Sequence, residues 1–62
     1  MYVLRRNEDG RYVAPAGSEH SYTRKLCNAR RFAASELERE QCENERALTI
    51  EQALACEASH GA

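Results

Sequence analysis

The sequence predicts a small α+β fold in which an antiparallel sheet, built from a hairpin and a closing strand, carries one short acidic helix. Three observations support this prediction. Two segments rich in β-branched and aromatic residues flank the turn sequence NEDG, a Glu-rich segment carries helix-capping residues, and a short apolar segment, ALTI, follows it. A chain of 62 residues has room for a single domain, residues 1–62, with a marginal core.

The hairpin is expected from strands at about 2–6 and 11–14. The flanking sequences YVLRR and RYVA have the composition of strands. Asp9-Gly10 between them is a strong hairpin signal, because glycine adopts without strain the positive φ that tight turns require.

The register of this hairpin decides which side chains share a face. A two- or four-residue loop places Tyr2, Leu4 and Val13 on one face of the sheet. A three-residue loop with a bulge groups Tyr2, Leu4 and Tyr12 instead. We favour the second register, because it gives the more apolar face.

The stretch after the hairpin combines a polar loop with a compact turn. Pro15 lacks an amide donor and ends the second strand, and the sequence PAGSEH that begins there is typical of a loop. Thr23 is expected to cap a short helical turn that places Leu26 and Ala29 on one side. The residues after this turn are then extended and direct Phe32 into the core.

The acidic helix is expected to begin after Ser35, as its N-cap, and to run to about Cys42. Ser35 and Glu38 match a capping box, and Glu36 and Glu38 stand in the first turn, where the helix dipole favours carboxylates. Glu36 and Glu40 share one flank of this helix, so its outer side is strongly acidic.

A closing strand at about 46–50 is expected to direct Leu48 and Ile50 to one side of the sheet. This strand completes the core that the hairpin, the turn and the helix begin. The predicted core residues are Val3 or Leu4, Tyr12 or Val13, Leu26, Phe32, Leu37, Leu48 and Ile50.

The C-terminal segment fits a second helix. Thr49 and Gln52 match another capping box, and apolar residues recur at helical spacing over about 50–58, with Gly61 beyond the end. The alternative is a frayed tail after about residue 55.

Charge is distributed unevenly along the chain, although the net charge is only −1. Residues 1–31 carry seven Lys or Arg and three Asp or Glu, a balance of +4, whereas residues 32–62 carry two and seven, a balance of −5. This polarity predicts a basic and an acidic surface, each able to orient the chain on a partner. The alternative is that the two halves neutralise each other in the fold.

The acidic half predicts another protein as the partner. Carboxylates of the acidic helix would meet a basic surface, such as that of a complex that handles nucleic acid. The partner-binding residues are then Glu36, Glu38, Glu40 and Glu43, with Glu45 close by. Further alternatives are that the hairpin edge pairs with a strand of another chain, and that the protein is a self-assembling structural protein, for example a homodimer.

The basic half offers the main alternative, a small nucleic-acid-binding protein. Its cations would contact phosphates, and Tyr12 or Tyr22 would stack on bases. The residues of this surface are Arg5, Arg6, Arg24, Lys25, Arg30 and Arg31, with Arg11 beside them. The acidic helix, the near-neutral net charge and the lack of a known reader motif weigh against this alternative.

Neither an enzyme nor a metal site is expected. The candidates Cys27, Cys42, Cys56, His20 and His60 are not paired at the short spacing of structural zinc sites. As partners of a cysteine nucleophile, His20 lies in a loop and His60 in a tail, and no carboxylate is singled out to orient either one. Three isolated glycines form no phosphate-binding loop, and no cofactor is expected. The odd number of cysteines and the lack of a long apolar segment favour a cytoplasmic protein that does not enter membranes.

Three segments, YVLRRNEDGRYVA, SYTRKLCNARRF and NERALTIEQAL, stand in an order that resembles a recurrent type of small bacteriophage and prophage protein. The resemblance covers roughly residues 1–54 and excludes Cys27. Its most recognisable residues are Tyr22, Thr23, Leu26, Ala29, Arg30 and Phe32.

The resemblance implies an accessory protein of a mobile element that acts by binding host machinery. Anti-CRISPR proteins are a prominent group of this kind; they are short and block nucleases or surveillance complexes by mimicry or steric occlusion. An inhibitor of a host complex that handles nucleic acid is therefore the activity that the resemblance implies.

Overall fold

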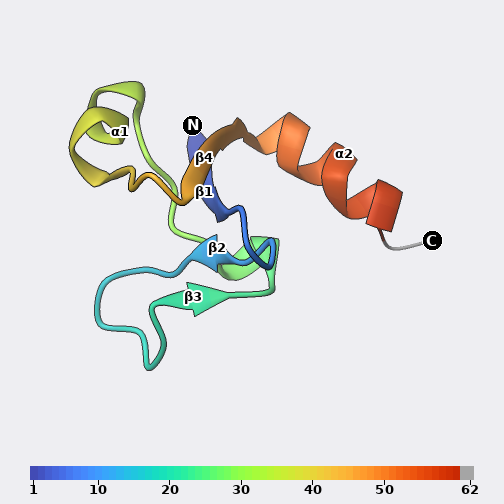
Figure 1. The fold of residues 1–62 in the computed structure, drawn as a ribbon, viewed down its shortest axis with the longest axis horizontal. Coiled ribbons are helices and arrows are strands. Elements are labelled where there is room, and N and C mark those ends of the chain that lie inside the picture. The colour runs from blue at the N-terminus through green and yellow to red at the C-terminus, as the bar shows by residue number, and fades with distance from the viewer. Residues whose placement is uncertain (61–62) are drawn as a thin grey trace.

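The computed structural model describes the backbone of residues 1–60 and the side chains of residues 1–58. It contains a four-stranded antiparallel sheet with strand order β3-β2-β1-β4, and two helices that extend to opposite sides of it (Figure 1). The strands are β1 Tyr2–Arg6, β2 Tyr12–Val13, β3 Tyr22–Thr23 and β4 Glu45–Thr49, and the two helices are α1 Ala34–Glu40 and α2 Ile50–His60. A short 3₁₀ turn, η1 Leu26–Asn28, follows β3. The predicted α+β class and the C-terminal helix are confirmed, and Gly61 lies outside the described residues.

A four-residue loop, residues 7–10, closes the hairpin. The amide of Arg6 donates to the carbonyl of Arg11 at 2.6 Å, and the amide of Gly10 donates back to the Arg6 carbonyl at 2.8 Å. Gly10 has a φ of 74°, as a tight turn requires, and Asp9 accepts the Arg11 amide through its side chain at 3.1 Å. The favoured three-residue loop is therefore wrong, and the four-residue alternative holds.

This register places Tyr12 on the face opposite to the predicted one. Arg5 lies directly across from Tyr12, and paired residues share a face, so Tyr12 joins Val3 and Leu48 on one side of the sheet. Leu4, the next residue along β1, points to the other side. Both members of the predicted pair Val3 or Leu4 are fully buried, because elements cover both faces of the sheet.

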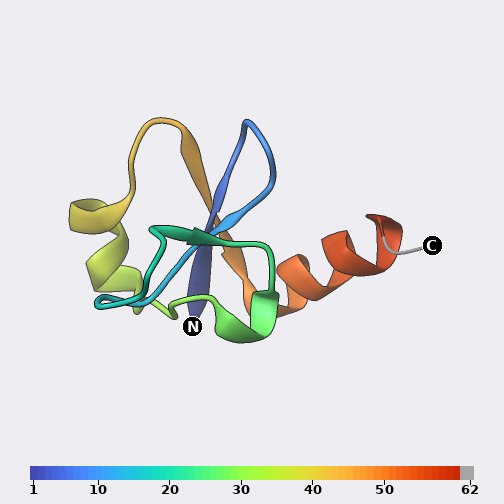
Figure 2. The ribbon, with the colours of Figure 1, turned by 90° about the horizontal axis from the view of Figure 1, so that it is seen from below.

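The main core combines residues from the hairpin, the η1 turn, β4 and α2. Its buried members are Val3, Tyr12, Ala29, Leu48 and Ala53, with Leu26, Ile50 and Cys56 packed against them. Ala29 follows η1 and Ala53 belongs to α2, so the turn and the C-terminal helix cover this face. Figure 2 shows η1 and α2 adjacent to each other beside the strands. Full burial of a side chain such as Leu48 contributes about 1.5–3 kcal/mol.

Phe32 closes the second face. It forms an antiparallel bridge with Tyr2, in which the two residues exchange amide-to-carbonyl hydrogen bonds of 2.9 and 2.7 Å. The Phe32 side chain is 1% exposed, as predicted for an extended segment that directs it inward. Leu4 is buried on this face too.

Helix α1 starts earlier than predicted and makes little contact with the core. Its N-cap is Ala33, and the carboxylate of Glu36 accepts the Ala33 amide at 2.9 Å, so the Ser35–Glu38 capping box does not form. The helix ends at Glu40, before Cys42. No residue of α1 is buried, and Leu37 is half-buried.

The end of β4 and the start of α2 follow the prediction closely. The strand is one residue earlier than expected, so Ile50 opens the helix. The Thr49 amide donates to Gln52 Oε1 at 2.9 Å, and the Gln52 amide donates to Thr49 Oγ1 at 3.1 Å. The predicted second capping box is thus confirmed.

Thr23 does not cap the turn as predicted. It belongs to β3, and the N-cap of η1 is Lys25, which makes no side-chain capping bond. Thr23 Oγ1 instead accepts the Lys25 amide at 3.2 Å and so bends the chain between β3 and η1.

Candidate functional site

The acidic side chains do not form the continuous helical surface that the sequence predicts. Glu38 and Glu40 are exposed on α1, but Glu36 is half-buried and lies 3.7 Å from the Arg30 guanidinium. Glu43 is exposed in the turn after the helix. Because Glu36 also caps its own helix, the carboxylates left for a partner are those of Glu38, Glu40 and Glu43.

Glu45 is a structural residue and not a surface one. It begins β4 and is 6% exposed. Its Oε2 accepts a 2.6 Å hydrogen bond from the Tyr22 hydroxyl, and its Oε1 accepts the Cys42 amide at 3.1 Å. Hydrogen bonding to Glu45, together with burial, raises the pKa of Tyr22.

Arg6 is occupied by contacts within the fold. Its guanidinium lies 4.1 Å from the centroid of the Tyr22 ring and forms a two-pronged ion pair with Asp9. The hydrogen bond from Arg6 is the main reason why the pKa of Asp9 lies well below its usual range. Arg6 is therefore a poor candidate for a phosphate contact.

The other predicted cations divide into paired and free groups. Arg5 Nε donates to the Gly10 carbonyl at 3.2 Å, and Arg30 combines its ion pair with a position 4.7 Å from the Phe32 ring centroid. Arg24, Lys25 and Arg31 are exposed, and none of them forms an ion pair with the described residues. The sequence leaves open the alternative that basic and acidic residues neutralise one another. This holds for only some of the cations of the predicted basic surface.

The fold brings Arg24 and Lys25 together with Arg11, which the sequence places beside the predicted basic surface. Arg11 joins them around a shallow hollow of about 430 Å³, which we call the basic hollow. Its other lining residues are His20, Tyr22, Thr23 and Asn28. No carboxylate is among its lining residues. Sequence reasoning could not group these residues, because Arg11 before β2 meets residues of β3 and η1 only after folding.

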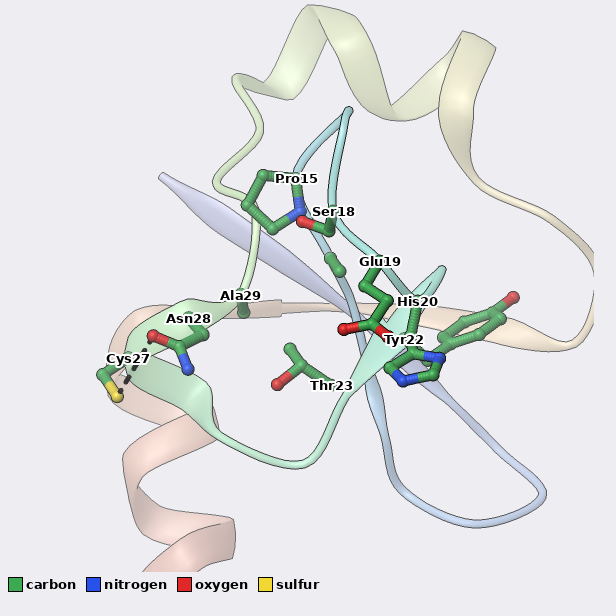
Figure 3. Close-up of a pocket in the computed structure, with 10 residues that line it drawn as sticks. Pro15, Ser18, Glu19, His20, Tyr22, Thr23, Cys27, Asn28 and Ala29 are labelled. Atoms are coloured by element: carbon green, nitrogen blue, oxygen red, sulfur yellow. Dashed lines mark hydrogen bonds between the residues drawn. The ribbon is translucent and has the colours of Figure 1, made fainter.

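A larger hollow of about 550 Å³ adjoins the basic hollow, and the two share His20, Tyr22, Thr23 and Asn28. We call it the side hollow. In Figure 3, Glu19, His20 and Tyr22 gather at one side of it and Cys27 and Asn28 at the other. Three small apolar residues, Ala14, Pro15 and Ala29, complete its lining together with Ser18.

Figure 3 also shows that Cys27 and His20 are not placed as a cysteine nucleophile and its histidine partner. Cys27 and His20 lie at opposite sides of the side hollow, and the Cys27 thiol contacts Asn28 Oδ1 at 3.8 Å (Figure 3). All three cysteines are free thiols. Within the described part of the chain, no three His, Cys, Asp or Glu side chains group to hold a metal ion; the side chain of His60 is outside that part.

The outer edge of β4 is largely closed to another strand. Tyr2 and Arg6 direct their amides away from β4, so by alternation Glu45, Ala47 and Thr49 direct theirs outward. Glu45 satisfies its amide with the Cys42 carbonyl at 3.1 Å and its carbonyl with the Gln41 side chain at 3.1 Å.

The Thr49 amide is taken by Gln52. Ala47 is then the one residue of β4 whose outward amide and carbonyl both lack a partner among the described residues. A single free residue is a poor template for strand addition.

Among residues 1–60, neither α1 nor α2 is both long and apolar enough to cross a bilayer. No known family model, curated protein or solved structure matches the chain. The resemblance to phage and prophage proteins stays a prediction.

Proposed function

We propose that this chain is a non-enzymatic protein-binding module whose contact surface centres on α1. One observation carries the proposal: α1 buries none of its residues and projects from the sheet on the side away from α2 (Figure 1). A surface element that adds nothing buried to a marginal core is well suited to contact another molecule.

The energetics of α1 support the same conclusion. Helices shorter than about 12–15 residues are marginal in water unless tertiary packing supports them. Helix α1 has seven residues, and within the chain its support consists of the half-buried Leu37, the Glu36 cap and the ion pair of Glu36 with Arg30. Docking on a partner would supply the burial that the helix lacks.

Charge defines the chemistry of the partner. Glu38, Glu40 and Glu43 are exposed, and Arg39 is the one cation of α1. Complementarity therefore calls for a basic surface on the partner, with charge steering their encounter. Proteins that handle nucleic acid carry such surfaces, and the resemblance to phage accessory proteins extends the proposal to an anti-CRISPR-like inhibitor of a host complex of this kind.

The three free thiols are consistent with a reducing compartment, so we place the module in the cytoplasm.

The test is an affinity capture from lysate, treated with nuclease, that compares the wild-type chain with the double charge reversal Glu38→Lys/Glu40→Lys. Both residues are exposed, and lysine near the end of α1 suits the helix dipole, so the variant should fold. Glu36 is left intact because it caps the helix. We expect a discrete protein that the wild type retains after nuclease and the variant loses.

The matched control is Glu8→Lys/Glu51→Lys, which changes the net charge equally at two exposed positions outside α1. It should retain the partner. Equal loss in both variants would show that only net charge matters, and retention by the folded Glu38→Lys/Glu40→Lys variant would contradict the role of α1.

A further inference from the structure

We propose that the basic hollow and the side hollow together form a binding site for a nucleoside phosphate, with the phosphate in the basic hollow and the base in the side hollow. The site is formed by β3, η1 and the segments that flank β2, and it does not rest on the function proposed for α1.

The basic hollow has the chemistry of an anion site. Arg11, Arg24 and Lys25 contribute three cations, and the lining contains no carboxylate. Arg24 and Lys25 are exposed without ion pairs to the described residues, so a ligand need not displace an existing partner. Charge-assisted hydrogen bonds from such groups to phosphate oxygens are among the stronger polar contacts in proteins.

Arg11 adds a cation that is in an ion pair with Asp9. Its Nε is buried and lies 3.3 Å from Asp9 Oδ2, yet it makes no hydrogen bond among the described residues. Asp9 is engaged by both Arg6 nitrogens and by the Arg11 amide. The Arg11 side chain is 38% exposed, so its guanidinium remains accessible to an incoming anion.

Neutral donors surround the cations. Thr23 Oγ1 accepts the Lys25 amide, which leaves its hydroxyl hydrogen free to donate. Asn28 accepts a weak contact from the Cys27 thiol through Oδ1, which leaves its amide nitrogen as a donor. Both residues line the boundary between the two hollows, where a sugar or its phosphate would lie.

The side hollow suits a planar group more than a second anion. His20 supplies an imidazole ring at its wall, and Ala14, Pro15 and Ala29 supply small apolar surfaces. Its volume of about 550 Å³ falls within the range of small-molecule sites. Glu19 is the one carboxylate in its lining, and it can accept hydrogen bonds from base amino groups or sugar hydroxyls.

A free nucleotide and a single strand of nucleic acid both present a base and a phosphate. The experiment therefore includes a ligand of each kind to tell them apart. Amide chemical shifts of the ¹⁵N-labelled full chain are followed by NMR during titration with AMP, adenosine, inorganic phosphate and a short oligoadenylate. We expect AMP to produce saturable shifts in residues 20–29, with adenosine and phosphate each binding more weakly. A clearly tighter oligoadenylate identifies a single strand as the source, and equal affinity identifies the free nucleotide.

Two double variants test the location. Arg24→Ala/Lys25→Ala should weaken AMP binding by about tenfold or more, because both removed cations line the basic hollow. Arg31→Ala/Arg39→Ala removes two exposed cations outside both hollows and should leave the affinity within about twofold. Well-dispersed amide spectra confirm that each variant is folded.

Three results would overturn the proposal: no saturable shift with either AMP or oligoadenylate, equal weakening in the two double variants, or phosphate binding as tightly as AMP. Phosphate binding as tight as that of AMP would show that the base gains no affinity from the side hollow.

Discussion

The Tyr22 hydroxyl donates a 2.6 Å hydrogen bond to Glu45 Oε2 and so joins the two edge strands of the sheet. Tyr22 lies on β3 and Glu45 on β4, with β2 and β1 between them. The Tyr22 and Glu45 side chains meet across these strands, and the guanidinium of Arg6, from β1, lies 4.1 Å from the centroid of the Tyr22 ring. Side chains thus connect strands whose backbones are not adjacent.

This bridge predicts a measurable contribution to stability. Tyr22→Phe would leave the nearly buried Glu45 carboxylate without one of its two donors, which we expect to cost about 1–3 kcal/mol. Urea unfolding of Tyr22→Phe, Glu45→Gln and the double variant forms the double-mutant cycle. A coupling free energy of at least about 0.5 kcal/mol is expected, and additive effects would show that the bond contributes nothing.

The two glycines with positive φ should respond differently to substitution. A Cβ at Gly10, with φ 74°, would meet Arg5 Nη2 at 2.6 Å, whereas a Cβ at Gly17, with φ 86°, would meet no atom within 4 Å. Backbone strain costs alanine about 1–2 kcal/mol at either position. Gly10→Ala should lower the urea midpoint more than Gly17→Ala, because its Cβ displaces the Arg5 guanidinium, which donates to the Gly10 carbonyl at 3.2 Å. The reverse order would contradict the hairpin geometry.

Stability should fall in alkaline solution because of Tyr12. Burial, followed by the 2.7 Å hydrogen bond to Glu57, raises the pKa of Tyr12 from 10.0 to about 12. The unfolded chain therefore releases this proton first, and the free energy of unfolding decreases as pH rises from 10 to 12. Tyr12→Phe should show a shallower decline over that window, and parallel profiles for the two proteins would contradict the burial of the hydroxyl.

The capping box at the start of α2 should matter for the whole fold, because Ala53 of that helix lies in the core. Thr49→Ala removes the acceptor of the Gln52 amide and should destabilise the protein by about 1 kcal/mol. Gln52→Glu keeps an acceptor for the Thr49 amide and should be tolerated. Thermal unfolding followed by circular dichroism compares the two, and equal losses would argue against the box.

Elements defined by short-range chemistry could be predicted from the sequence. Asp9-Gly10 located the hairpin, because the required positive φ is a property of one residue. Thr49 and Gln52 located the start of α2 within a residue, because a capping box spans only four positions. Phe32 was placed correctly in the core for a similar reason, since an apolar aromatic beside charged residues has one favourable direction.

Features that depend on distant segments could not be predicted. Tyr12 faces the main core because η1 and α2 cover that side of the sheet, and nothing near the hairpin encodes their position. The burial of Glu45 depends on Tyr22, 23 residues away. The start of α1 was misplaced because Glu36 reaches back to the Ala33 amide, which needs no capping side chain at Ala33.

The candidate site, too, could be predicted from the sequence only in part. Arg24 and Lys25 were named as cations of a binding surface, and both line the basic hollow. Their grouping with Arg11 and His20 arises from the pairing of β2 with β3, whereas Arg6 and Arg30 are diverted into contacts within the fold. The sequence shows which residues of the candidate site are charged, but only the tertiary structure shows which residues each of them contacts.

Hydrogen exchange of the amides at residues 38–41, in the free chain and with the captured partner bound, tests the docking role of α1 most directly. These are the amides that the helix itself hydrogen-bonds, the last being Gln41 to the Leu37 carbonyl at 3.0 Å. Because α1 buries no residue, they should exchange rapidly in the free chain and at least about tenfold more slowly in the complex. Unchanged exchange at 38–41, with protection confined to β3 and η1, would contradict the account and place the interface on the other surface.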